Sequence, residues 1–68
     1  MNKMEVTDYV AEKLDVIRRL QHDPELAHAE EKLLWETVLR LAGDGYDVQD
    51  AANKALKSNE IDFPRWFA

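Results

Sequence analysis

Hydrophobic residues recur along the first third of the chain at the spacing of an α-helix. They are separated by four, four, three and three positions: Val6, Val10, Leu14, Ile17 and Leu20. Such a stripe lies on one face of a helix, whereas a half-buried strand alternates at every second residue. The pattern predicts a helix over about residues 3–22. Asn2 followed by Glu5 predicts a capping box at its start, with Thr7 as the alternative cap.

A second helix is predicted from the pair Asp23-Pro24. Proline disfavours helical geometry in the residue before it, so the first helix must end there. Proline also suits the first position of a new helix, with Asp23 as its N-cap. This helix is predicted over about residues 24–42, with Gly43 as a left-handed C-cap.

The rest of the chain predicts a short third helix and an aromatic tail. An alanine-rich stretch follows Asp47, which suits an N-cap position, and predicts a helix over about residues 48–58. The tail, residues 59–68, holds three of the six aromatic residues. We predict an all-α fold in which residues 1–68 form a single domain. Its architecture is a small three-helix bundle, a helical hairpin plus a short third helix, closed by the C-terminal aromatic tail.

Composition narrows the range of functions. The chain has 68 residues, 46% of them hydrophobic, a net charge of −5 and no cysteine. Because the chain is so short, a substrate cavity would remove much of its hydrophobic core. We therefore expect neither an enzyme nor a bound cofactor. The acidic charge makes nucleic acid an unlikely partner. No apolar run has the length of a signal peptide or a membrane span, which predicts a cytoplasmic protein with no membrane contact.

The second half of the second predicted helix is more apolar than a surface helix needs. Seven of the ten residues 33–42 are apolar, and at about 100° per residue they cover an arc of roughly 240°. An ordinary surface helix shows an apolar stripe little more than about 100° wide. Either the rest of the bundle covers this arc, or part of it is an interface with another protein or with a second copy, which would form a homodimer through this helix.

The aromatic tail allows two interpretations. It folds back to cap the bundle, or it anchors another protein, since tryptophan and arginine are common at the centres of interfaces. The second interpretation, combined with the apolar helix, gives a set of candidate partner-binding residues: Trp35, Leu39, Phe63, Arg65, Trp66 and Phe67.

A row of carboxylates follows one side of the first predicted helix. Its members are three or four residues apart: Glu5, Asp8, Glu12 and Asp15. We call this row the acidic ridge. It is either a solvated face or a surface that steers the protein towards a basic groove on another macromolecule.

Candidate metal and catalytic groups are sparse. Glu25 and His28 have the Glu-x-x-His spacing of di-iron bundles, but the motif occurs once and such a site needs two copies. The aspartates of the loop at residues 43–50 lack the ligand spacing of an EF-hand. Ser58 is the only serine and has no histidine near it in sequence. No metal site and no catalytic residue is predicted.

Residues 39–56 resemble the first half of some helix-turn-helix domains. The resemblance rests on Gly45-Tyr46 and on four residues that would be core positions: Val48, Ala51, Ala52 and Leu56. It implies a transcriptional regulator with a second, DNA-reading helix. That helix would fall in residues 59–67, which contain a proline and two acidic residues instead of the basic and amide side chains that read a major groove.

These observations favour a non-enzymatic protein–protein interaction module. We expect a small acidic accessory or inhibitor protein that occupies a surface of a larger protein. Two alternatives stay open. One is a degenerate helix-turn-helix regulator, and the other is an acidic mimic of nucleic acid that blocks a DNA-binding protein through the acidic ridge.

Overall fold

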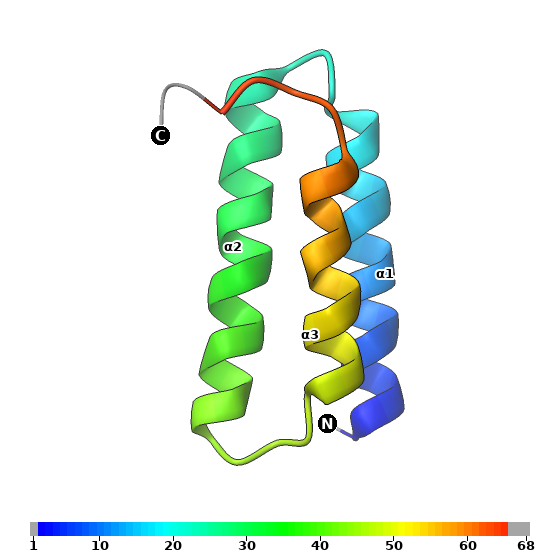
Figure 1. Ribbon diagram of the computed structural model, residues 1–68, viewed down its shortest axis with the longest axis vertical. Coiled ribbons are helices and arrows are strands. Elements are labelled where there is room, and N and C mark those ends of the chain that lie inside the picture. Colours follow the sequence, from blue (N-terminus) through cyan, green and yellow to red (C-terminus); the bar gives the residue numbers. More distant parts are fainter. Residues whose placement is uncertain (1, 66–68) are drawn as a thin grey trace.

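The computed structural model describes residues 2–65 and confirms the all-α fold. It contains three α-helices, α1 (Lys3–Arg19), α2 (Pro24–Gly43) and α3 (Gln49–Ala55), and α3 continues into a 3₁₀ helix, η1 (Leu56–Glu60). The helices α1 and α2 form an antiparallel hairpin, and α3 runs beside them in the direction of α1 (Figure 1). α1 packs against both α2 and α3, whereas α2 and α3 approach each other less extensively. The predicted hairpin plus short third helix is therefore the observed arrangement.

The start of α1 carries the predicted capping box. The backbone N–H of Glu5 donates to Asn2 Oδ1 at 2.8 Å, and Asn2 Nδ2 donates to the Glu5 carboxylate at 3.0 Å. The Thr7 hydroxyl instead donates to the carbonyl of Lys3 at 3.1 Å, inside the helix. Asn2 is therefore the N-cap and Thr7 is not.

This cap yields a first prediction. Asn2→Ala should lower the free energy of unfolding by about 1 kcal/mol, because it leaves an N–H group of the first turn without its partner. Asn53→Ala is the matched control, since Asn53 is exposed inside α3, where alanine favours the helix. Chemical denaturation followed by circular dichroism measures both. Equal changes in the two variants would show that the cap contributes nothing.

The start of α2 also follows the prediction, but its end does not. Asp23 Oδ1 accepts from the backbone N–H of Leu26 at 3.4 Å, with Pro24 in the first turn. Gly43 was predicted as a left-handed cap, and instead it is the last residue of the helix. The residue with positive φ is Gly45, at 93°. The helix extends further because the N–H of the next residue, Asp44, still bonds back to a carbonyl of α2, and the chain reverses only at the second glycine.

Two other helix ends differ from the predictions. α1 stops at Arg19 and not near residue 22, since the chain must turn before Pro24. The α-helical part of the third helix covers only Gln49–Ala55, one residue later than predicted. Its N-cap is Val48 and not the predicted Asp47, whose Oδ1 accepts from the Gln49 N–H at 3.3 Å. The change to 3₁₀ geometry has a packing reason, because three residues per turn places Ala55, Ser58 and Ile61 on one buried side.

The core lies between the three helices and under the segment that follows η1. α1 supplies four buried residues of the predicted stripe, and α2 and α3 supply leucine, valine and alanines. Small alanines in α3 allow it to approach α1 closely. Two residues of the tail, Ile61 and Phe63, complete the core. Among residues 2–65, no helix has both the length and the apolar character needed to cross a bilayer.

Candidate functional site

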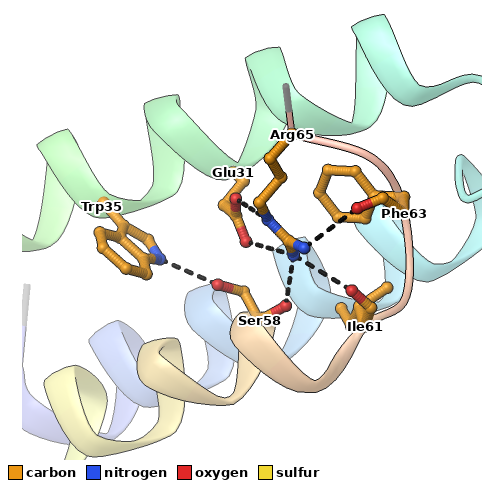
Figure 2. A network of polar contacts seen from close by, with 6 residues as sticks. All are labelled: Glu31, Trp35, Ser58, Ile61, Phe63 and Arg65. Carbon is orange, nitrogen blue, oxygen red and sulfur yellow. Dashed lines mark hydrogen bonds and ion pairs between the residues drawn. The ribbon is translucent and has the colours of Figure 1, made fainter. Parts of the chain in front are cut away.

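A partly buried ion pair joins the tail to the first half of α2. Arg65 Nε donates to Glu31 Oε1 at 2.8 Å and Arg65 Nη2 donates to Glu31 Oε2 at 3.0 Å (Figure 2). This two-point geometry matches the planar guanidinium to the planar carboxylate. Glu31 is only 7% exposed, so its charge depends on this partner.

The same guanidinium also ties down the backbone of the tail. It donates to the carbonyl oxygens of Ser58, Ile61 and Phe63 at 2.9, 3.1 and 3.2 Å (Figure 2). Its central carbon lies 3.8 Å from the centre of the Phe63 ring, a cation–π contact. Arg65 therefore caps the end of η1 and holds the tail across the ends of α2 and η1.

Trp35 extends this network from the neighbouring turn of α2. Its indole Nε1 donates to the hydroxyl of Ser58 at 3.0 Å, and the Ser58 side chain contributes to lowering the pKa of the Glu31 carboxyl. Ser58 is fully buried, so its hydroxyl needs the indole as a partner. We refer to Glu31, Trp35, Ser58 and Arg65 as the tail clasp.

The electrostatics of the clasp follow from burial and pairing. Burial alone would raise the pKa of Glu31, but the hydrogen bonds from Arg65 and Ser58, together with the positive charge of Arg65, outweigh burial and lower that pKa. Hydrogen bonding to Glu31 likewise raises the pKa of Arg65. Both groups are thus charged at neutral pH. The ion pair therefore holds the tail on α2 at neutral pH.

An apolar hollow opens beside the clasp, between α2 and α3. Its volume is about 180 Å³, and it is lined by six residues: Trp35, Val38, Leu39, Ala52, Ala55 and Leu56. Two alanines leave space where larger side chains would fill the gap. Leu39 stands at its edge with 71% of its surface exposed, and Leu56 is also more than half exposed. We call this hollow the α2–α3 groove.

The groove continues along α2 in the direction of the tail. A second hollow, of about 250 Å³, lies beside it and shares Trp35 and Leu39 as walls. Its other lining residues are charged or polar: His28, Glu31, Lys32 and Glu36. The two hollows together form an elongated surface along α2 whose exposed lining is mainly apolar, with charged residues among the walls of the second hollow.

The structure separates the six predicted partner-binding residues into three groups. Trp35 and Leu39 lie on the surface and line the α2–α3 groove. Phe63 is buried in the core and Arg65 belongs to the tail clasp, so both side chains are engaged within the chain itself. Trp66 and Phe67 lie outside the described residues. Of the predicted aromatic tail, Phe63 is thus the aromatic residue seen to pack on the bundle.

Glu31 and Ser58 were not predicted as site residues. Glu31 stands in a run of charged residues at 30–32, where nothing distinguishes a buried carboxylate from a solvated one. Ser58 is an ordinary helix-end residue in sequence. Their importance arises from Arg65, which is 34 positions away from Glu31. The lining alanines of the groove, Ala52 and Ala55, belong to the alanine-rich stretch that predicted the third helix.

The acidic ridge is on the surface of α1. All four carboxylate residues are exposed: Glu5, Asp8, Glu12 and Asp15. Glu5 bonds to the N-cap and Asp15 pairs with Arg18 at 3.3 Å. Asp8 and Glu12 make no ion pair with any other described residue. Arg18 thus partly compensates the negative charge at the Asp15 end of the ridge, whereas Glu5 bonds to a neutral amide.

No metal-binding cluster of three or more histidine or carboxylate side chains forms within residues 2–65. Glu25 is exposed near the start of α2 and His28 is half-buried one turn later. The segment after η1, residues 61–65, contains no helix. Within the position of the recognition helix that the helix-turn-helix resemblance implies, residues 59 and 60 end η1 and residues 61–65 are non-helical.

Comparison with known proteins gives no match for this chain among family models, curated proteins or solved structures.

Proposed function

We propose that this protein is a non-enzymatic protein–protein interaction module that binds another protein through the α2–α3 groove. The observation that carries the proposal is the exposure of Leu39 beside an apolar hollow lined by Trp35 and two alanines. Leucine with 71% of its surface in water forgoes most of the roughly 1.5–3 kcal/mol that its burial contributes. An apolar side chain of a partner protein, inserted into the hollow, would cover both the hollow and Leu39.

The tail clasp supports the proposal by making the groove rigid. Trp35 forms a wall of the groove, and its indole is fixed by Ser58 at 3.0 Å. A wall held in place loses little conformational entropy on binding, which favours affinity. The occupant that fits is a helix or loop presenting a leucine, methionine or phenylalanine, with polar groups towards His28 and Lys32. The proposed mode of action is that of an accessory or inhibitor protein, which works by covering a surface of its partner.

We propose that the protein is located in the cytoplasm. Small domains in oxidising compartments commonly carry disulfides, and this sequence has no cysteine.

The proposal predicts a specific loss of binding in a leucine variant. Leu39→Asp should lower the affinity for the partner at least tenfold, because it places a charge in the apolar groove. Leu33→Asp is the matched control, since Leu33 is also an exposed leucine of α2 and does not line the groove. Partners captured from a cell lysate with the native protein are identified, purified and titrated against each variant, with circular dichroism confirming the fold.

Retention of binding by Leu39→Asp would remove the groove as the binding surface. The same titration tests the nucleic-acid mimic, which the two unpaired carboxylates of the acidic ridge favour. If the mimic is correct, Asp8→Lys combined with Glu12→Lys abolishes binding and Leu39→Asp does not.

A further inference from the structure

The exposed side of α2 carries a second row of side chains next to the groove. Four charged residues follow one another at intervals of four, and all are exposed: Lys32, Glu36, Arg40 and Asp44. Their signs alternate along the helix as positive, negative, positive and negative. Residues four apart lie in one row along a helix surface. We call them the alternating row.

The pairing within the alternating row is incomplete in the single chain. Lys32 and Glu36 are 4.0 Å apart, at the limit of an ion pair, and both are largely exposed. Within residues 2–65, Arg40 and Asp44 take part in no ion pair. The row therefore has charge available for an intermolecular contact.

A row with these alternating signs is complementary to itself when reversed. If two copies of α2 lie antiparallel about a two-fold axis on this exposed face, midway between Glu36 and Arg40, Lys32 faces Asp44, the residue that follows α2, of the second copy. Glu36 then faces Arg40 of the second copy. The two-fold axis repeats each contact, so every position meets the opposite sign. A parallel pairing in the same register would place like charges together.

The apolar row beside these charges suits the same arrangement. Trp35 and Leu39 are also four residues apart, and the axis passes one position from Leu39. Each copy offers both a protruding Leu39 and a hollow floored by Ala52 and Ala55. A two-fold interface requires a protrusion and a recess on the same surface, because both copies present the same patch.

The dimensions allow such an interface. In this register residues 32–44 of the two copies lie side by side, and at about 1.5 Å per residue they span about 20 Å. A standard interface buries about 800 Å² on each partner, which is roughly one sixth of the accessible surface of 4644 Å². One face of the molecule can supply that area.

From these observations we propose that a second copy of this chain occupies the exposed face of α2. The pair is an antiparallel homodimer in which the alternating row supplies the register and Leu39 is covered by the other copy. This inference rests on the proposed function, because it names an occupant of the same surface. The dimer is the form present without another partner, and partner binding competes with it.

Charge reversal with mixing tests the proposal. Glu36→Lys gives a chain with two positive charges at positions 36 and 40, and Arg40→Glu gives a chain with two negative charges there. Each variant alone should dimerise at least tenfold more weakly than the native chain, because attraction becomes repulsion at both symmetric contacts. An equimolar mixture of the two should recover the native dissociation constant, since the two chains are complementary. Sedimentation equilibrium in 0.15 M salt follows the doubling of the 7.9 kDa mass.

A control and the possible outcomes complete the test. Glu25→Lys changes a carboxylate outside the row, so it should leave dimerisation unchanged. The proposal is overturned if the native chain stays monomeric up to millimolar concentration, or if the mixture associates no better than each variant alone. A native monomer that still binds a partner through Leu39 would remove the dimer and leave the proposed function intact. A native dimer that no partner dissociates would remove the proposed function and leave the dimer intact.

Discussion

Arg65→Ala is expected to lower the free energy of unfolding at pH 7 by about 2 kcal/mol. The substitution leaves the Glu31 carboxylate buried without its partner, and it frees three backbone carbonyls at the end of η1. Breaking a fully buried ion pair costs about 3–5 kcal/mol. We expect less here because the Arg65 side chain is 30% exposed, and solvent weakens the interaction on that side. Urea denaturation followed by circular dichroism at 222 nm measures the change.

The loss in this variant should depend on pH in a defined direction. In the native chain the pKa of Glu31 lies below its ordinary value of 4.5. Its contribution to stability is therefore present above pH 4.5 and disappears as the pH falls through the lowered pKa. In the variant burial is left as the dominant influence, so the pKa of Glu31 should rise above 4.5. The variant then loses stability as the pH rises through that range, and its difference from the native chain should be largest at neutral pH.

Two further variants distinguish the effect of the two-point hydrogen bonding of Arg65 from the effect of its charge. Arg65→Lys keeps the positive charge but cannot make two parallel hydrogen bonds, so its loss should fall between those of the native chain and the alanine variant. Replacing Glu31 and Arg65 together by methionine removes both charges and should cost less than Arg65→Ala. An identical loss for Arg65→Ala at pH 3 and pH 7 would contradict the assigned role of Glu31.

Leu34→Ala is expected to have the largest effect on stability of all the substitutions considered, about 3 kcal/mol. Leu34 is fully buried at the centre of α2, and truncation of a buried leucine costs about 2–5 kcal/mol through lost burial and the cavity left behind. A domain of 68 residues has a total stability of only about 3–10 kcal/mol. The variant should therefore lose a large part of its cooperative unfolding transition, measured by thermal denaturation.

The neighbouring leucine provides the control for this prediction. Leu33→Ala removes the same atoms one position earlier, from a side chain that is 48% exposed, so it should cost well under 1 kcal/mol. Similar losses in the two variants would mean that α2 is oriented differently in the bundle. The comparison thus tests which side of α2 faces the core.

The sequence predicted most of the helical structure, but not which part of α2 stays exposed. Seven apolar residues in 33–42 predicted that the helix needs wide coverage, and the bundle covers Leu34 and Val38 while leaving Leu33 and Leu39 in water. The difference arises because α3 is short and rich in alanine, and it approaches α1 more extensively than α2. The size and position of the gap between α2 and α3 depend on that packing. Hydrophobic periodicity in the sequence carries no information about it.

What the sequence determined by itself is local in the chain. The α1 stripe, the Asn2 capping box and the Asp23-Pro24 helix start depend on residues at most a few positions apart, so their physics can be assessed without a fold. The tertiary structure alone decided the tail clasp, the α2–α3 groove and the side of α2 that remains open. Glu31 and Arg65 are 34 positions apart, and only burial next to that guanidinium distinguishes this carboxylate from the solvated acids around it, since a charge leaves water only where a partner replaces its hydration.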